Sequence, residues 1–222
     1  MRCLVTAGPT YEPIDQVRRL TNFSTGRLGA TLASLFAEAG HEVVLLRGYY
    51  ATVRVCDHRV ELVEYSSTSD LNEKLSGLAP HADAVFHAAA VSDFRVKRVF
   101  QRVEGQEVEL KDGKIPTSKD NFFAEFEPTR KILPGLRNLF PQAYLVGWKY
   151  EVDGDRAASV KKGREQLSVS QTDACVINGP SYGAGFGLLR AEDSQSGRVE
   201  NLANESALAA RLLEHWRLVR PQ

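Results

Sequence analysis

The first fifty residues alternate between short apolar runs and one amphipathic stretch. Residues 2–7 form an apolar run that a Gly-Pro pair ends, and residues 42–46 form a second run. Between them, residues 27–39 repeat apolar side chains at helical spacing, and Gly40 follows as a stop signal. Continuous apolar runs of this length are typical of parallel strands that are buried on both faces. The pattern therefore predicts a strand–helix–strand unit, the opening of a doubly wound sheet.

The same alternation continues through the rest of the chain. The expected strands are residues 60–63, 84–87, 122–127, 143–147 and 174–177, and the expected helices are residues 69–78, 129–139, 155–167 and 204–218. Residues 187–191 and 198–202 are predicted to pair as a terminal hairpin. We therefore expect a single domain over residues 1–222 of the α/β class. Its sheet should be Rossmann-like, doubly wound and mostly parallel, with a C-terminal antiparallel hairpin.

Two long segments, residues 8–26 and 92–121, show no clear helical or strand period. Loops of this length inside a compact domain are usually functional or mobile. Both segments follow the carboxyl ends of predicted strands, which is where open α/β sheets bind their ligands. The two segments are therefore the first candidates for a binding site.

Charge and composition exclude several classes of function. The 222 residues include 28 Lys plus Arg and 28 Asp plus Glu, whereas nucleic-acid-binding domains usually carry a basic excess. The chain has no apolar run of the roughly 20 residues that a membrane helix needs, and it opens on a strand rather than a signal peptide. Cys3, Cys56 and Cys175 are far apart in the sequence, which is typical of reduced thiols. We expect a cytoplasmic protein that binds neither nucleic acid nor membrane.

Glycine and hydroxyl side chains gather just before the first predicted helix, in the sequence TNFSTGRLG of residues 21–29. Gly26 and Gly29 allow a ligand to approach the backbone closely, and a helix N-terminus attracts anions. Ser24 and Thr25 add hydroxyl donors for phosphate oxygens. An ordinary N-cap by either hydroxyl explains the same residues equally well. Neither the P-loop ending nor the GxGxxG spacing occurs, so any phosphate site here is of another type.

The sequence HAAAVSDF, residues 87–94, places three small side chains after a buried strand. The space that the alanines leave is commonly filled by a base or a sugar, although close helix packing is the alternative. Asp93 follows at the ligand edge of the sheet. Its carboxylate could hold a ribose hydroxyl, an amide or a magnesium ion, or simply cap a turn. His87 has no neighbouring residue that suggests a catalytic triad, and we interpret it as structural.

Three further side chains are candidates on loops or at strand ends. The loop GKIPTSK, residues 113–119, carries Lys114, and a lysine on a mobile loop either folds onto phosphates or remains solvated. Trp148 follows a predicted strand, where its ring either stacks on a base or packs under the sheet. Asn178 ends another buried strand, where its amide either reads a base edge or caps a turn.

Six segments follow one another along the chain: VTAGPTYEPIDQVRRLTNFSTGRLG, AAAVSDF, GKI, PTRKIL, VGWKYE and VING. In this order they resemble phosphopantothenoylcysteine synthetase over essentially the whole chain. The first segment is long and specific, and AAAVSDF and VGWKYE corroborate it independently. The resemblance implies a ligase of coenzyme A biosynthesis in a stand-alone form without flavin. Such a ligase activates 4′-phosphopantothenate with CTP or ATP and Mg²⁺, releasing pyrophosphate, and then joins the acyl-nucleotidylate to cysteine.

The resemblance also implies roles for individual residues. Asn22 matches the asparagine that holds the acyl group of the intermediate, and Lys114 matches a flap lysine that reaches the triphosphate. Arg18 matches an arginine that reaches into the site of a partner subunit, which implies a homodimer. The nucleotide-binding positions would be Gly8, Ser24, Gly26, Gly29, Ala88, Lys114, Trp148 and Asn178. The substrate-binding positions would be Arg18, Asn22, Ala89, Ala90 and Asp93.

Two departures from the family pattern leave alternatives open. Gln166 and Ser170 stand where CTP-using bacterial members carry two lysines, so both CTP and ATP remain candidates. A non-catalytic nucleotide-binding relic of the family is an alternative for the same reason. The long stretch before Lys114 leaves Lys119 as an alternative flap lysine. A NAD(P)-dependent reductase is a further alternative, which the missing GxGxxG and Tyr-x-x-x-Lys patterns disfavour.

Overall fold

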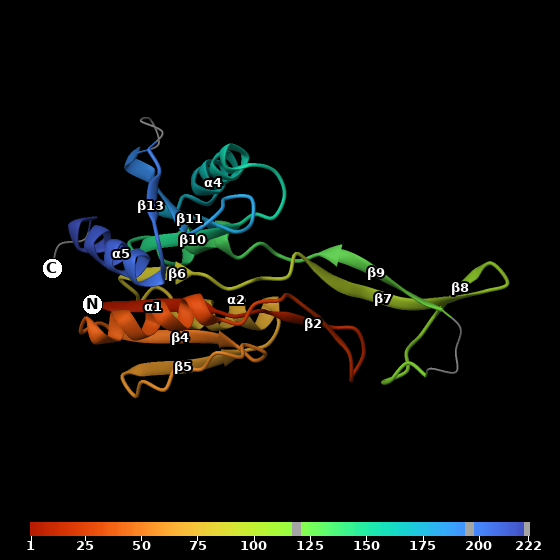
Figure 1. Cartoon of the computed structure of the whole chain (residues 1–222). Coiled ribbons are helices and arrows are strands. Elements are labelled where there is room, and N and C mark those ends of the chain that lie inside the picture. Colours follow the sequence, from red (N-terminus) through yellow and green to blue (C-terminus); the bar gives the residue numbers. More distant parts are fainter. Residues whose placement is uncertain (117–120, 194–197, 220–222) are drawn as a thin grey trace.

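The computed structural model describes residues 1–116, 121–193 and 198–219, and its centre is an eight-stranded sheet (Figure 1). The strands are β1 (Arg2–Ala7), β4 (Glu42–Gly48), β5 (Val60–Tyr65), β6 (Ala84–His87), β10 (Tyr144–Tyr150), β11 (Ala174–Asn178), β12 (Phe186–Arg190) and β13 (Glu200–Leu202). Their order is β13-β12-β11-β10-β6-β1-β4-β5. From β5 to β11 neighbouring strands pair in parallel, whereas β12 and β13 pair antiparallel. The predicted fold class is confirmed.

Helices cover both faces of this sheet. One face carries α1 (Arg27–Glu38) and α5 (Glu205–Val219), and the other carries α2 (Thr68–Leu78), α3 (Leu136–Leu139) and α4 (Arg156–Ser170). Two 3-10 turns, η1 (Leu133–Gly135) and η2 (Ala191–Asp193), are the remaining helical elements of the described chain. Within the described residues, no helix has the length and apolar character needed to span a bilayer.

The chain reverses its direction of travel across the sheet at β1. It moves outward from β1 to β4 and β5, then returns to β6 and continues to β10 and β11 on the opposite side. The switch point therefore lies between β1 and β6, and ligands of open α/β sheets bind at the carboxyl ends of strands at such a point. The register places Thr6 of β1 and Gly147 of β10 on either side of His87.

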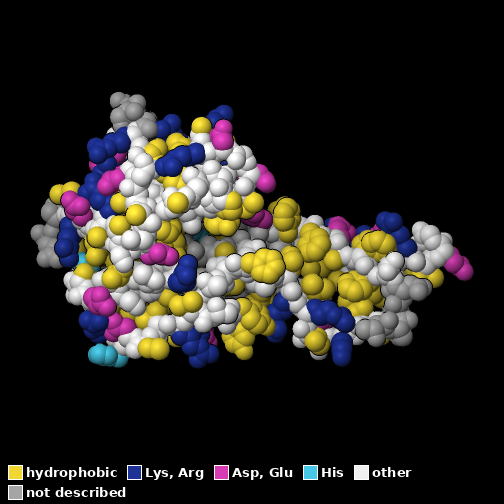
Figure 2. All heavy atoms as spheres, in the orientation of Figure 1, with side chains coloured by type: hydrophobic (Ala, Val, Ile, Leu, Met, Phe, Trp, Pro, Cys, Tyr) yellow, Lys and Arg dark blue, Asp and Glu magenta, His cyan; other side chains and the backbone are white. Residues whose placement is uncertain are grey.

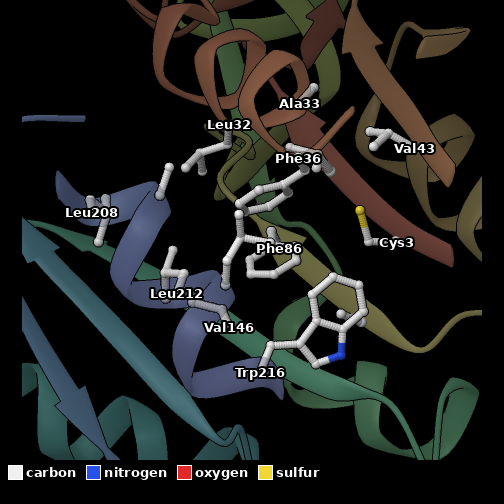
Figure 3. Close-up of a cluster of buried hydrophobic side chains, with 14 of the residues drawn as sticks. Cys3, Leu32, Ala33, Phe36, Val43, Phe86, Val146, Leu208, Leu212 and Trp216 are labelled. Atoms are coloured by element: carbon white, nitrogen blue, oxygen red, sulfur yellow. The ribbon is translucent and has the colours of Figure 1, made fainter. Parts of the chain in front are cut away.

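Alternate side chains of the central strands enter two separate cores. Cys3 and Val5 of β1 face α1 and α5, whereas Leu4 faces α2 and α3. The core under α1 and α5 contains Phe86 and Trp216, which Figure 3 shows. The ring centroid of Phe86 lies 4.5 Å from that of Phe36 and 5.9 Å from that of Trp216. The aromatic cluster fixes the positions of α1 and α5 on the sheet. It therefore also fixes the position of the first turn of α1.

Three strands lie outside the central sheet and form an arm. They are β7 (Phe94–Val103), β8 (Gln106–Glu109) and β9 (Phe122–Pro128), paired antiparallel in the order β8-β7-β9. Figure 1 shows the arm extending away from the central sheet. The sequence pattern did not predict β7 or β8. The reason is a register shift between Val96 and Arg98, which breaks the two-residue alternation halfway along β7.

A short hairpin lies beside the base of the arm. Its strands are β2 (Tyr11–Pro13) and β3 (Arg19–Thr21), which pair antiparallel within the first unassigned segment. Both unassigned segments of the sequence thus contain strands: β2 pairs with β3 within the first segment, and β7 pairs with β8 within the second and with β9 beyond it. The expected helix over residues 129–139 was wrong in extent, since only Leu133–Gly135 and Leu136–Leu139 are helical.

The arm exposes an unusual amount of apolar surface, which Figure 2 shows as an extended patch of hydrophobic side chains. Between 40% and 52% of each side chain is exposed for Phe94, Val103, Val108, Phe122, Phe123 and Phe126. Ion pairs such as Arg98 with Glu107 and Arg95 with Glu127 run along the same strands. Contiguous exposed apolar surface with a charged border is typical of protein–protein contact sites.

We predict that Phe86→Ala lowers the free energy of unfolding by about 3–5 kcal/mol, because it opens a cavity between α1, α5 and the sheet. Urea unfolding followed by circular dichroism measures the change. Leu62→Ala is the control, because this residue of β5 is 48% exposed, and it should cost less than about 1 kcal/mol. Equal losses in the two variants would contradict this account of the core.

Candidate functional site

The loop after β1 and the start of α1 both pack against one small side chain, that of Ala51. Gly8 and Gly26 both have a positive φ, +83° and +76°, which side chains other than glycine adopt rarely. A Cβ on Gly8 would lie 2.6 Å from the Cβ of Ala51, and one on Gly26 would lie 2.9 Å from it. Only glycine therefore allows the two backbones to approach so closely, and the segment after β4 supports both.

The start of α1 presents its backbone without a side-chain cap. Gly26 is the N-cap residue, and no acidic side chain lies in the first turn. Neither Ser24 nor Thr25 is the N-cap residue, but Thr25 Oγ1 accepts a 3.3 Å hydrogen bond from the Arg27 N–H, so the hydroxyl interpretation holds in part. A helix start of this kind has unsatisfied N–H groups and a positive dipole end, which favour a bound anion.

Hydrogen bonds join this loop to the alanine segment after β6. The Ala90 N–H donates to the Gly8 carbonyl at 3.0 Å, and the Ala90 carbonyl accepts from the Thr10 N–H at 3.1 Å. The exposed Asn22 side chain donates through Nδ2 to the same Ala90 carbonyl at 3.2 Å. The structure therefore brings together Asn22, Gly8 and Ala90, which come from two segments about 80 residues apart.

The buried residue His87, together with Thr6, supports the backbone of the alanine segment, residues 88–90. Thr6 Oγ1 lies 2.9 Å from His87 Nδ1 and accepts a 3.1 Å hydrogen bond from the Ala89 N–H. Burial lowers the pKa of His87 from 6.5 to about 4, so the imidazole is neutral near pH 7. The neutral ring and Thr6 hold the backbone of Ala89 in place, which agrees with a structural role for His87.

Asp93 lies further out on the same segment and is paired. Its carboxylate contacts the ammonium group of Lys131, and 65% of each side chain is exposed. The Asp93 carbonyl also accepts a 2.9 Å hydrogen bond from the Thr129 N–H. No sequence pattern singled out Lys131, although this residue follows Thr129 and Arg130 in the PTRKIL segment that carried part of the resemblance.

Buried hydroxyl groups connect the β2–β3 hairpin to the Asp93 segment by hydrogen bonds. No sequence pattern had indicated these groups. Thr10 Oγ1 accepts a 2.8 Å hydrogen bond from the Ser92 N–H and donates to Ser92 Oγ at 3.2 Å. Thr68 Oγ1 donates to Thr10 Oγ1 at 3.4 Å. No local pattern could have found this network, because its members lie on three segments far apart in the sequence.

An open cleft of about 470 Å³ lies at the carboxyl end of β11. Its lining includes Asn178, Tyr150 and Phe186, together with residues 203–205 at the start of α5. An Arg27–Glu205 ion pair of 3.8 Å links the start of α5 to the start of α1. This ion pair therefore connects the edge of the cleft with the start of α1.

Trp148 lies on the face of β10 that α1 and α5 cover. Its ring is partly buried against the first core, and its indole Nε1 is buried without a hydrogen-bond partner among the described residues. Gln166 Nε2 donates to the Trp148 carbonyl at 3.1 Å, and Ser170 is buried. The two residues that replace family lysines therefore support β10 and the packing of α4.

Two predicted basic residues lie away from this cleft. Arg18 is at the tip of the β2–β3 hairpin, where it pairs with Asp15 at 2.6 Å. Lys114 is exposed on a segment that adjoins the same tip, because the Gln16 N–H donates to the Gly113 carbonyl at 2.9 Å. The alternative flap lysine, Lys119, lies outside the described residues.

No group of three or more His, Cys, Asp or Glu side chains in the described chain could hold a metal ion. Asp93 offers one carboxylate at the ligand edge, already paired with Lys131. Mg²⁺ needs about six oxygen ligands and commonly takes several of them from substrate phosphates and water. These residues therefore suit a magnesium ion that arrives with a nucleotide rather than one held by a protein cage.

Comparison with known proteins agrees with this geometry. The family described as DNA/pantothenate metabolism flavoprotein C-terminal domain matches residues 1–214. The chain belongs to this family. A solved member, the DNA/pantothenate metabolism flavoprotein from Streptococcus pneumoniae, superimposes with a TM-score of 0.86 at 25% identity and covers 99% of this chain and 100% of that one.

Curated relatives carry the name coenzyme A biosynthesis bifunctional protein CoaBC. The protein from Thermococcus kodakarensis is 33% identical over 80% of this chain and 41% of its own length. The protein from Mycobacterium bovis is 30% identical over 96% of this chain and 51% of its own length. The chain thus spans about half the length of these relatives.

We predict that Gly29→Ala lowers the free energy of unfolding by about 1–3 kcal/mol, because its Cβ would lie 2.5 Å from the Cβ of Ala7. Gly77→Ala is the matched control in a helix, since a Cβ there meets nothing within 4 Å. It should leave stability unchanged or raise it by up to about 1 kcal/mol. Urea unfolding measures both, and a stabilising Gly29→Ala would contradict the close packing of α1 on β1.

We predict that stability falls more steeply in acid for the wild type than for His87→Asn. Because the folded-state pKa of about 4 lies below the ordinary 6.5, the contribution is full above pH 6.5 and is lost as the pH falls to 4. The difference between the two proteins should change by about 3 kcal/mol across this window. Urea titrations at several pH values measure it. Parallel pH profiles would show that His87 is not held neutral.

Proposed function

We propose that this chain carries the phosphopantothenate–cysteine ligase activity of coenzyme A biosynthesis. The carboxylate of 4′-phosphopantothenate attacks the α-phosphate of CTP or ATP, forming a C–O–P linkage and breaking the Pα–O–Pβ bond to release pyrophosphate. The cysteine amine then attacks the acyl carbon, forming an amide and losing a proton as the nucleoside monophosphate leaves. The observation that carries the proposal is the bond from Asn22 to Ala90, beside the uncapped start of α1.

The start of α1 would bind the phosphates of the nucleotide. Gly8 and Gly26 let the loop after β1 pack against the start of this helix, and the partly buried Ser24 lies just before it. Positive dipole and N–H groups at this point would stabilise the charge that moves onto pyrophosphate. A bound Mg²⁺ would neutralise phosphate charge as a Lewis acid. Ala88 would contribute by leaving room for the ligand, whereas Gly29 would contribute by letting α1 pack closely on β1.

The acid would lie next to these phosphates, on the alanine segment. The Asn22 amide is exposed beside the Ala90 carbonyl and would donate to the acyl oxygen as charge develops on it. Ala89 would provide space and backbone contacts. Asp93 would bind a polar group of the substrate, displacing or sharing Lys131. Holding two reactants at one strand edge lowers the entropic cost of their reaction.

The base would occupy the 470 Å³ cleft at the end of β11. Asn178 lines this cleft, and its amide can donate to and accept from a base edge. Trp148 lies on the same face and has a buried indole N–H without a partner in the described chain. These groups suit both a pyrimidine and a purine, so the proposal includes both CTP and ATP.

We also propose that the active form is a homodimer. The apolar surface of the arm is the support for this, because it includes Phe94, Phe122 and Phe126 at 42–52% exposure. Arg18, at the tip of the neighbouring hairpin, would then reach the site of the second subunit. Its guanidinium uses two of five donors on Asp15 and Ile115, which leaves three for a ligand.

One observation favours a second candidate, a nucleotide-binding protein of this family that has lost catalysis. Gln166 and Ser170 replace two family lysines and are both engaged in packing, so neither position supplies a positive charge. Such a protein would bind the triphosphate but would release no pyrophosphate when the acid is added.

We predict that the purified chain releases pyrophosphate from CTP or ATP when Mg²⁺, 4′-phosphopantothenate and cysteine are present. Testing four nucleoside triphosphates identifies the one used. Asn22→Asp should slow amide formation more than pyrophosphate release, by roughly 10²–10³-fold, because a carboxylate repels the developing oxyanion. Rapid-quench measurements of the two steps separate these effects.

Asn138→Asp is the matched control for that experiment, since Asn138 is exposed on α3. It should keep wild-type rates for both steps. If a folded wild-type chain binds a triphosphate but releases no pyrophosphate, the non-catalytic alternative is correct. Unchanged amide formation in Asn22→Asp would remove Asn22 from the mechanism.

A further inference from the structure

One exposed ion pair at the ligand edge is not explained by the strands around it. Asp93 lies just before β7, and Lys131 lies three residues after the end of β9. The Lys131 ammonium group contacts the Asp93 carboxylate, and 65% of each side chain is exposed. The next ion pair along these strands, Arg95 with Glu127, joins residues that face each other in the β7–β9 ladder. Strand pairing therefore accounts for that pair but not for Asp93 with Lys131.

The backbone on both sides of the Asp93–Lys131 pair is fixed. The Thr129 N–H donates to the Asp93 carbonyl at 2.9 Å, and Thr129 Oγ1 donates to the Ser92 carbonyl at 2.5 Å. Ile132, which directly follows Lys131, is buried in the core under α2 and α3. The two charged groups thus extend into solvent from a base that hydrogen bonds and apolar packing hold in place.

An ion pair with this exposure adds little to stability, because water solvates both charges and the side chains lose rotamer freedom on pairing. Asp93 and Lys131 can therefore each exchange the partner for a ligand group of the same charge. A ligand that carries both an ammonium group and a carboxylate would exchange both partners at once and would leave no charge unpaired. Such a ligand is a zwitterion.

The balance of charge at this position favours a zwitterion over an anion. The Asp93 carboxylate would repel the phosphate or the carboxylate of the acid, and Lys131 with Asp93 has no net charge to attract either. The start of α1 differs in this respect, because it offers positive potential and has no acidic side chain in its first turn. Phosphates and a zwitterion would therefore bind at separate places.

The Asp93–Lys131 pair lies within reach of the acyl group in the proposed reaction. Asp93 is three residues after Ala90, whose carbonyl accepts from Asn22, so the Cα atoms of residues 90 and 93 are at most about 11 Å apart. Val91 and Ile132 pack against the core under α2 and α3, whereas α1 lies on the opposite face of the sheet. A ligand held by the pair would approach the acyl carbon from a side that a nucleotide at α1 leaves free.

We propose that Asp93 and Lys131 form the binding site for the second substrate, a zwitterionic α-amino acid, which in the ligase reaction is cysteine. This rests on the proposed function. Asp93 accepts hydrogen bonds from the α-ammonium group, and Lys131 donates charge-assisted hydrogen bonds to the α-carboxylate. The ammonium group releases one proton to water before its nitrogen attacks and a second as the amide forms. Lys131 determines specificity, because an amine without the α-carboxylate loses this contact.

Cysteamine tests the assignment, because it is cysteine without the α-carboxylate. Lys131→Gln should raise the KM for L-cysteine about tenfold, through the loss of one charge-assisted hydrogen bond, and should change the KM for cysteamine less than about twofold. Lys131→Arg should restore most of the preference for cysteine. Asp93→Asn should raise the KM for both amines alike, since both carry the ammonium group. Steady-state rates of amide formation with each amine measure these effects.

The first step of the reaction separates this proposal from the ligase function itself. Exchange of labelled pyrophosphate into the triphosphate requires the acid but no cysteine, and Lys131→Gln should keep the wild-type exchange rate. Lys97→Gln is the matched control, because this lysine of β7 also pairs with a carboxylate, that of Glu125, and is 52% exposed. It should keep the wild-type KM for both amines.

Two results would overturn the amino-acid site and leave the ligase function intact. One is an unchanged KM for cysteine in Lys131→Gln. The other is an equal rise in KM for cysteine and cysteamine in that variant, which would mean that Lys131 does not contact the α-carboxylate. A folded wild type that shows neither pyrophosphate exchange nor amide formation would instead contradict the ligase function, and the cysteine site with it.

Discussion

The close approach of three backbone segments on Ala51 is the constraint on which the candidate site depends. Gly8 and Gly26 adopt left-handed conformations and lack the Cβ atoms that would collide with this side chain. Their approach puts the uncapped end of α1 directly above the carboxyl end of β1, with Ala90 hydrogen-bonded to Gly8. Bulkier residues would cost strain as well as space, since positive φ is unfavourable for them. The backbone geometry on which the proposed anion site depends thus follows from steric necessity in this loop.

Two cores of different composition hold this arrangement. The aromatic cluster of Phe36, Phe86 and Trp216 sets the position of α1 on one face. On the other face the sheet edge ends in polar contacts, where Thr6 and His87 support the alanine segment. Apolar packing fixes the elements to within a few tenths of an ångström, and the buried hydrogen bonds select which backbone groups face the ligand.

The charges of the site are divided between two parts of the molecule. The central sheet supplies an uncapped helix start and an amide, whereas Arg18 and Lys114 are carried at the end of the hairpin. Hydrogen bonds of Thr10 with Ala90 and Ser92 hold the base of the hairpin, and the Asp15 carboxylate accepts the backbone N–H groups of Arg18 and Ile115 at its tip.

The sequence by itself determined the central sheet and the place of the ligand edge. Continuous apolar runs such as residues 42–46 and 174–177 can be recognised as strands because burial on both faces requires every side chain in them to be apolar. The glycines near 26 likewise pointed to the loop before α1 as a candidate site, and the motif order pointed to the right family. The strand β9 was predicted, but tertiary structure alone decided its pairing with β7, because the register shift in β7 hides the alternation of that strand and the two strands pair across some 25 residues. It alone decided also that Lys114 sits beside Arg18 and not beside Asn22, since hydrogen bonds to Asp15 join residues 100 apart in sequence.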